Sequence, residues 1–366
     1  MLKVFASPSR YVQGRDATAS LGAELAHLGL IGPAFIVAPQ PVREQLEPTW
    51  RESLGAAGIS FVVHDFAGEC SDRQIGIGIA AARAAGARLI IGVGGGKTLD
   101  TARAISNALA LPIVTCATLA STDAPCSALS VVYTDDGSFE RLQLYPRNPD
   151  LVLVDTAVIA KTPRRFLVSG MGDALATWYE ARTCIEAGSP NAVGGVTTLA
   201  AAAIAELCAR TLYADGLEAA RSIEAGELTP ALDRVIEANT LLSGLGFESG
   251  GLAIAHSVHD GLTAAAGTHA YMHGEKVSFG LLVQLVVEQR PAAEIDQVLT
   301  FCRSVGLPTT LAEIGLADAD DATGALIAAG TVAPQESAHN EPFPVTADLI
   351  ARGIRAADAL GQAGRD

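Results

Sequence analysis

The chain has 366 residues, of which 49% are hydrophobic and 5% aromatic, and its formal net charge is -15. This length is typical of two domains, and the apolar content excludes an intrinsically disordered chain. The negative charge would repel nucleic acids and anionic membranes, so we expect neither as a partner.

Cysteine usage and the apolar stretches indicate a cytoplasmic protein. The six cysteines form no CxxC pair, and several lie in apolar stretches, so we interpret them as reduced core thiols. The first residues contain no apolar run after a basic start, and we therefore expect no signal peptide. The most apolar stretch, 199–207, is shorter than a membrane span and contains Glu206.

Up to about residue 155, short β-branched runs alternate with helical patterns. The expected helices include 72–85 and 97–108, and the expected strands are 34–38, 60–64, 88–93, 112–116 and 151–155. This alternation predicts a Rossmann-like α/β domain with a doubly wound parallel sheet. Two further strands, 128–133 and 140–145, flank Asp135-Asp136-Gly137 and predict a β-hairpin.

From about residue 161 the strand signals almost disappear. Thr162-Pro163 indicates a helix start, and the remainder is rich in Ala, Leu, Glu and Arg. We therefore expect an α/β domain over 1–160 and an all-helical domain over 161–366.

A run of glycines follows the buried strand 88–93. Gly94-Gly95-Gly96-Lys97 opens a helix, and glycines there allow positive φ and a close approach of the backbone to a ligand. With the helix N-terminus they predict an anion site suited to a pyrophosphate. A Walker A loop would need glycine at Ile91, and a GxGxxG motif would need it at Lys97, so neither motif applies. A tight turn without a ligand is the alternative.

A polar loop, 117–127, follows the next strand, where ligands of open α/β sheets bind. Within it, Asp123 is a candidate to bind a substrate hydroxyl or pass on its proton, although an ordinary turn or cap residue is the favoured interpretation when Asp123 is taken alone. Cys126 is better interpreted as a packed thiol, because no histidine lies nearby in sequence to activate it.

Four of the seven histidines cluster between 256 and 273. We expect one apolar helix over 250–259 and a helix start at 272–277, so His256 and His273, 17 residues apart, would have to converge from two elements. Asp173, expected to open a helix over 174–180, is a candidate third ligand. One aspartate and two histidines with an open position suit catalytic Zn²⁺, or Fe²⁺ less selectively.

Long motifs resemble the glycerol dehydrogenases of the iron-containing alcohol dehydrogenase superfamily. They are GGGKTLDTA (94–102), ASTDAPCSALSVVYTDDG (120–137), GMGDALATW (170–178), TPALDRVIEANTLLSGLGFESGGLAIAHSVHDGLTA (229–264) and HGEKVSFG (273–280). The resemblance implies an N-terminal cofactor domain, a helical C-terminal domain and an active site in the cleft between them. It also implies NAD-dependent, metal-dependent oxidation of glycerol or vicinal diols such as 1,2-propanediol to the hydroxyketone, by a homo-oligomer that is often an octamer.

The same resemblance implies roles for individual residues. The substrate contacts are Asp123, which is also the candidate catalytic residue, and His256. The metal ligands are Asp173, His256 and His273. The cofactor contacts are Gly94, Gly95, Gly96, Lys97, Asp100, Thr118, Ser121, Ser127, Leu129 and Tyr133.

Two positions depart from the family pattern. Members with four metal ligands carry a histidine at the place of Thr177, which favours the three-ligand zinc branch over the iron enzymes. The family usually has an aspartate after the second strand to hold the adenosine ribose, whereas Pro39-Gln40 stands here, so NADP is not excluded.

Three other functions are alternatives to this one. A dehydroquinate synthase-like lyase and a glycerol-1-phosphate dehydrogenase would both need basic residues for an anionic substrate, and the motifs quoted above are poor in Lys and Arg. A helical scaffold with a relict cofactor domain is the third, and the four residues Asp123, Asp173, His256 and His273 argue against it.

Overall fold

The computed structural model describes residues 1–363 of the chain. Two compact units are present. The first, called here the α/β unit, comprises Ser7–Pro163 with Ala225–Leu228. The second, the helical unit, comprises Met1–Ala6, Arg164–Glu224 and the chain from Thr229 onward.

The α/β unit is built on a six-stranded parallel sheet with the strand order β1-β8-β5-β4-β2-β3. Its strands are β1 (Tyr11–Gly14), β2 (Ala34–Ala38), β3 (Phe61–Asp65), β4 (Leu89–Gly94), β5 (Ile113–Ala117) and β8 (Leu151–Asp155). Five of the six were predicted to within a residue. The sequence did not indicate β1, because its four residues YVQG carry no apolar alternation, and its place comes from pairing with β8.

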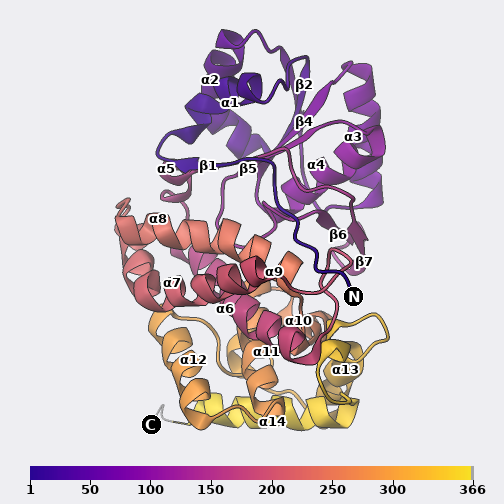
Figure 1. Cartoon of the computed structure of the whole chain (residues 1–366), viewed down its shortest axis with the longest axis vertical. Helices are drawn as coiled ribbons and strands as arrows, with labels where there is room; N and C mark the ends of the chain where they lie inside the picture. The colour runs from indigo at the N-terminus through magenta and orange to yellow at the C-terminus, as the bar shows by residue number, and fades with distance from the viewer. Residues whose placement is uncertain (364–366) are drawn as a thin grey trace. The chain divides into compact units, whose positions relative to one another are not determined.

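Helices cover both faces of this sheet. Alternate side chains of β2 enter opposite cores, with Ile36 in the same cluster as Trp50 and Phe35 in the same cluster as Ile105. Figure 1 shows α1 and α2 on one side of β2 and β4, and α3 and α4 on the other. Burial of apolar side chains on both faces is the pattern of a doubly wound sheet, and the predicted fold class is confirmed.

The helices and the hairpin of the α/β unit also follow the predicted pattern. The helices are α1 (Leu21–His27), α2 (Gln40–Ala56), α3 (Asp72–Ala84), α4 (Gly96–Leu109) and α5 (Thr156–Ile159), with a 3-10 turn at Ala17–Ser20. The predicted hairpin is formed by β6 (Leu129–Tyr133) and β7 (Phe139–Leu144), a separate antiparallel sheet.

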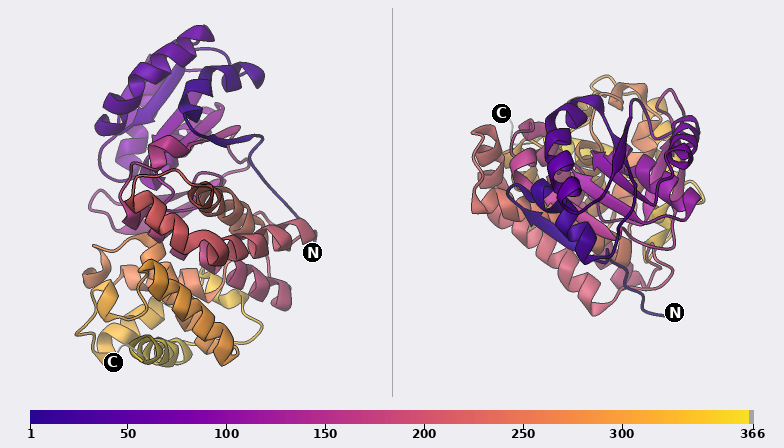
Figure 2. Two further views of the ribbon diagram at one scale, coloured as in Figure 1. Left: turned by 90° about the vertical axis from the view of Figure 1, so that its left-hand side faces the viewer. Right: turned by 90° about the horizontal axis from the view of Figure 1, so that it is seen from above.

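The described residues of the helical unit, 1–6 and 164–363 without 225–228, fold into helices and loops, with one isolated β-bridge between Lys3 and Val196. Figure 2 shows these helices from two further sides. They are α6 (Arg164–Ala187), α7 (Leu199–Glu224), α8 (Pro230–Glu237), a π-helical turn (Ala238–Leu242), α9 (Ser243–Gly250), α10 (Ile254–Thr263), α11 (His273–Val287), α12 (Ala292–Val305), α13 (Asp321–Thr331) and α14 (Ala347–Gln362), with 3-10 turns at Ala266–Thr268, Ala312–Ile314 and Ser337–Asn340.

Within the described part of the chain, no helix combines the length and apolar character that crossing a bilayer requires. The six cysteines are all buried thiols there, as the sequence predicts.

Candidate metal and cofactor sites

The predicted metal ligands lie on three helices that pack backbone to backbone. A Cβ on Gly274 of α11 would lie 1.8 Å from the carbonyl oxygen of Ser169 in α6, and one on Gly172 would lie 2.3 Å from the carbonyl oxygen of Gly274. Between α11 and α10, a Cβ on Gly280 would lie 2.3 Å from the carbonyl oxygen of Ala255. Only glycine permits such close approach, and this brings the side chains of the three helices together.

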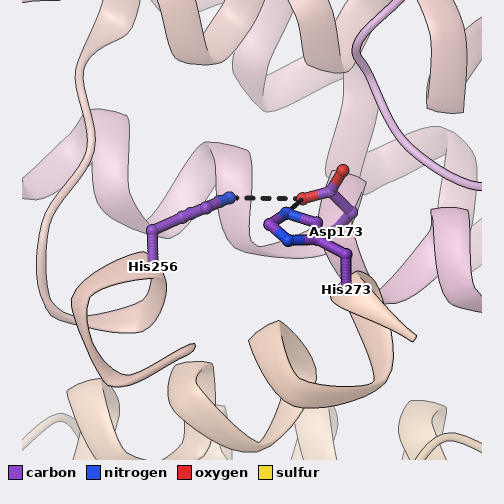
Figure 3. A group of neighbouring side chains, drawn as sticks. All are labelled: Asp173, His256 and His273. Carbon is purple, nitrogen blue, oxygen red and sulfur yellow. Dashed lines mark hydrogen bonds and ion pairs between the residues drawn. The ribbon is translucent and has the colours of Figure 1, made fainter. Parts of the chain in front are cut away.

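Asp173, His256 and His273 converge on one point, and their ligand atoms all lie within 4.8 Å of one another. Asp173 Oδ1 is 3.2 Å from His256 Nε2 and 3.1 Å from His273 Nε2, so both rings face the same carboxylate oxygen (Figure 3). The side chain of Asp173 is 1% exposed and that of His273 is 34% exposed. The cluster is therefore enclosed on the aspartate side and accessible on the His273 side.

A second carboxylate orients His256. Glu180 Oε2 lies 2.5 Å from His256 Nδ1, and Glu180 Oε1 accepts the backbone N–H groups of Ala253 and His256. Histidines that ligate metals commonly donate their other ring nitrogen to a carboxylate in this way. Sequence reasoning missed Glu180, although its spacing of seven residues from Asp173 places both on one face of α6.

His273 has an orienting partner of a different kind. Its Nδ1 lies 3.0 Å from His259 Nε2, and His259 Nδ1 lies 2.8 Å from Asp260 Oδ1. The first turn of α11 is itself fixed by Glu275, which accepts the N–H of Met272 and forms an ion pair with Arg165 of α6. His259 belonged to the histidine cluster noticed in the sequence, but nothing in the spacing indicated this contact.

The electrostatics of the cluster favour positive charge. Burial disfavours ionisation of Asp173, but His273 and His256 outweigh it and lower the pKa of this carboxyl. Burial likewise disfavours protonation of His256, but Glu180 and Asp173 raise the pKa of the ring well above its usual value. Burial and the neighbouring His273 lower the pKa of His259 to about 3. Two buried carboxylates thus create a centre in which a cation is stabilised.

Two sequence predictions about these helices are wrong. Asp173 does not open a helix at 174–180, because it lies in the middle of α6, whose Gly172 serves helix packing. The segment 250–259 is not one helix: α9 ends at Gly250, Gly251 has φ 109°, and α10 begins at Ile254. The break exposes the N–H of Ala253, which Glu180 accepts, so it helps to place His256.

The glycine loop connects β4 to α4, with Gly95 as the N-cap. The expected positive φ is wrong, since Gly94, Gly95 and Gly96 do not adopt it. Glycine is required at positions 94 and 95 because a side chain there would collide with neighbouring residues. A Cβ on Gly94 would lie 2.7 Å from Thr98 Oγ1, and one on Gly95 would lie 2.9 Å from Leu119 Cδ1. A Cβ on Gly96 would meet nothing closer than Thr122 Oγ1 at 3.7 Å.

The polar loop 117–127 lies beside the glycine loop. The N–H of Thr118 donates to the carbonyl of Gly94 at 3.1 Å, which holds the two loops together at the ends of β4 and β5. Ser121 and Asp123 are buried, and Ser127 donates to the carbonyl of Ala124. These residues share the carboxyl edge of the sheet, where open α/β sheets bind ligands.

Lys97 and Asp100 differ in how they are held. The side chain of Lys97 is 57% exposed, and its Nζ lies 2.5 Å from Glu69 Oε1, a partner that the sequence did not indicate. Asp100 is buried, pairs with Arg103 at 2.8 Å, and accepts the N–H of Val131. Asp100 therefore supports the start of the hairpin.

Arg103 completes this support from inside the unit. Its guanidinium donates to the carbonyl oxygens of Leu129 and Ala124 as well as to Asp100, and its side chain is 2% exposed. The backbone N–H of Tyr133 donates a hydrogen bond to the carbonyl oxygen of Cys70. The segment from Ala124 to Tyr133 is thus anchored to α4 and to the loop before α3.

The chain is similar to known proteins over nearly its whole length. Residues 8–156 match the family model described as iron-containing alcohol dehydrogenase. A glycerol dehydrogenase of Citrobacter freundii is 48% identical over 99% of each chain. A glycolaldehyde reductase of Halobacterium salinarum is 45% identical over the full length of both.

Solved structures point the same way. The structure of a probable glycerol dehydrogenase from Sinorhizobium meliloti has a TM-score of 0.93, with 41% identity and 99% coverage of each chain. Sequence identity at this level along the whole chain, together with this similarity of fold, leaves one assignment. The chain belongs to the iron-containing alcohol dehydrogenase family.

Proposed function

We propose that this chain is a glycerol dehydrogenase, which oxidises glycerol and related vicinal diols to hydroxyketones and reduces NAD⁺. The observation that carries the proposal is the cluster of Asp173, His256 and His273, found in a chain similar to glycerol dehydrogenases over nearly its whole length. A non-enzymatic scaffold would have no use for three ligand atoms directed at one point that is accessible from one side. The proposed domain roles are cofactor binding in the α/β unit and metal binding in the helical unit.

The donor set of the cluster fits a resident divalent cation, for which we propose Zn²⁺ with Fe²⁺ as the alternative. One carboxylate and two imidazoles, accessible from one side, are typical of catalytic zinc sites. Thr177 stands where a fourth ligand would be needed and is hydrogen-bonded to Ser243 at 2.8 Å, which supports the three-ligand reading. When bound, such an ion supplies Lewis-acid polarisation of a hydroxyl oxygen.

The carboxyl edge of the sheet supports a dinucleotide. Gly96 offers backbone without a side chain beside Thr122, and the start of α4 presents N–H groups and a positive dipole end. We assign the pyrophosphate to Gly94, Gly95, Gly96 and Lys97. The remaining proposed cofactor contacts are Thr118, Ser121, Ser127, Leu129 and Tyr133, while Asp100 acts through the hairpin.

The roles of the chain's own residues in the reaction follow from their positions. Glu180 and His259 hold the rings of His256 and His273 with their Nε2 atoms toward Asp173. Asp123 is proposed to hold a substrate hydroxyl, or to take the proton that leaves it. When bound, the nicotinamide ring of the cofactor would accept the hydride from the substrate.

A matrix of substrates and cofactors on protein of defined metal content tests the proposal. We expect NADH formation from glycerol with Zn²⁺ restored after chelation, and loss of both activity and bound metal in His256→Ala. Full activity of His256→Ala with metal rigorously excluded would refute the metal role.

The same matrix separates the alternatives. Glycerol phosphate tests the phosphate-specific rival, and glycolaldehyde with NADH tests the activity named for the Halobacterium relative. NAD⁺ preference rests on the family, because Pro39 caps α2 where a carboxylate would discriminate, so a higher kcat/KM with NADP⁺ would overturn it. Assembly into a homo-oligomer, up to an octamer, stays a prediction.

A further inference from the structure

The two histidines of the metal cluster are oriented in different ways. His256 contacts the carboxylate of Glu180 directly, whereas His273 reaches a carboxylate through a second ring, in the order His273 Nδ1, His259 Nε2, His259 Nδ1 and Asp260 Oδ1. The two links in this chain measure 3.0 and 2.8 Å. We propose that His259 and Asp260 are positioning residues that preorganise His273 for metal binding, a role that rests on the proposed metal site.

Hydrogen-bond chemistry determines the polarity of this chain. A histidine that ligates a metal through Nε2 carries its hydrogen on Nδ1, so His273 Nδ1 must donate. His259 Nε2 is the acceptor that faces it. His259 Nδ1 is then the donor to Asp260, whose ionised carboxylate can only accept. Each ring nitrogen in this chain therefore has a single role, as either donor or acceptor. The opposite tautomer of either ring would place two donors or two acceptors against each other.

The surroundings make this arrangement rigid. The side chain of His259 is only 10% exposed, and its ring meets that of His273 edge-on, with centroids 4.2 Å apart. His259 and Asp260 lie on α10, which packs against α11, so they link His273 of α11 to the helix that carries His256. His273 is the most exposed of the three proposed ligands, with 34% of its side chain accessible. It is therefore the ligand whose ring depends most on a partner to stay in place.

Metal affinity tests the proposal without relying on turnover. The dissociation constant for Zn²⁺ is measured by competition with a fluorescent chelator, and the environment of the ion is followed through the visible absorption of a Co²⁺-loaded sample. We expect His259→Phe, which keeps a ring but removes the acceptor, to weaken Zn²⁺ binding about 10–100-fold and to alter the Co²⁺ spectrum. Asp260→Ala should also weaken Zn²⁺ binding. Asp260→Asn retains an accepting oxygen and should keep most of the Zn²⁺ affinity.

The control is His339→Phe. His339 is exposed, and its ring nitrogen Nε2 contacts the backbone carbonyls of Val332 and Ala333, so its replacement should leave both readouts unchanged. If His259 had a purely structural role, His259→Phe would lower the stability of the metal-free protein and leave its Zn²⁺ affinity unchanged. That result would overturn the proposal.

His273→Ala distinguishes failure of the proposed metal site from failure of the proposed positioning role. If the unmodified protein binds Zn²⁺ and His273→Ala weakens it, the metal site stands, and the His259 and Asp260 variants decide the positioning role. Should His273→Ala bind as tightly as the unmodified protein, both the metal site and the positioning role are refuted. If His259→Phe does not fold, the comparison of Asp260→Ala with Asp260→Asn decides instead.

Discussion

Gly274 packs so closely on Ser169 that a Cβ added to the glycine would lie 1.8 Å from the serine carbonyl oxygen. Gly274 directly follows His273 in α11, and a Cβ on it would also lie 2.9 Å from the backbone nitrogen of Asp173 in α6. The distance at which the two helices cross therefore sets the separation of two proposed metal ligands. Small residues at this crossing are a condition for the site as well as for the core.

Gly274→Ala should consequently damage both stability and metal binding. Neither backbone can yield without separating the helices, so we expect a loss of about 1–3 kcal/mol in the free energy of unfolding and weaker Zn²⁺ binding. Urea denaturation and chelator competition measure the two effects. Gly324→Ala is the matched control, because a Cβ there meets nothing within 4 Å in α13, and it should be neutral or stabilising by up to about 1 kcal/mol. Equal behaviour of the two variants would contradict the prediction.

Glu180→Ala should reduce metal affinity without removing a ligand. The variant loses the carboxylate that accepts from His256 Nδ1 and from two backbone N–H groups, so His256 is no longer oriented. We expect Zn²⁺ binding to weaken about 10–100-fold, with Glu180→Gln affected less. Glu186→Ala, on the same helix but in an exposed pair with Arg290, serves as the control. Wild-type affinity in Glu180→Ala would show that the carboxylate is not needed.

Arg103→Met should destabilise the α/β unit and weaken cofactor binding together. The substitution leaves Asp100 as a buried carboxylate without its guanidinium and removes donors from the carbonyls of Leu129 and Ala124. We expect a loss of about 3–5 kcal/mol in the free energy of unfolding. NADH binding, followed by fluorescence, should weaken because the segment from Ala124 to Tyr133 is released.

Arg141→Met provides the comparison for this variant. Arg141 pairs with Asp72 at the surface, with both side chains at least 40% exposed, so we expect less than about 1 kcal/mol. A stability loss in Arg103→Met as small as that in Arg141→Met would mean that the buried pair does not hold the hairpin.

Glu341→Gln should stabilise the protein increasingly as the pH rises. Burial, with Glu288 and Glu180 nearby, raises the pKa of Glu341 from 4.5 to about 9. Below about pH 4.5 both states hold the proton, and between these values the unfolded chain loses it while the folded chain keeps it. The native carboxyl therefore lowers stability progressively up to about pH 9.

The amide of the variant imitates the protonated carboxyl and avoids this loss. Urea denaturation at about pH 5 and about pH 8 should give a difference between variant and wild type that grows by about 1 kcal/mol or more, since one unit of pKa corresponds to about 1.4 kcal/mol. Parallel stability profiles of the two proteins would contradict the raised pKa.

The sequence by itself determined the α/β architecture, because local patterns carry it. A strand buried on both faces needs a continuous apolar run, as at β2 and β4, and Pro39 and Gly95 directly follow these two strands. The family was likewise readable from long contiguous motifs, and the comparisons confirm it. The local pattern was misleading before Asp173, which was expected to open a helix but lies inside α6. The preceding Gly172 does not end a helix there, because it allows the close packing of Gly274.

Only the tertiary structure decided how the metal candidates are held. Residue type and the family resemblance named His256 and His273 as candidate ligands. The partners Glu180, His259 and Asp260 follow from how α6, α10 and α11 cross. The same holds for Arg103, whose three acceptors are up to 26 residues away. Hydrogen bonds between separate elements depend on orientation and distance in space, and neither composition nor periodicity records these.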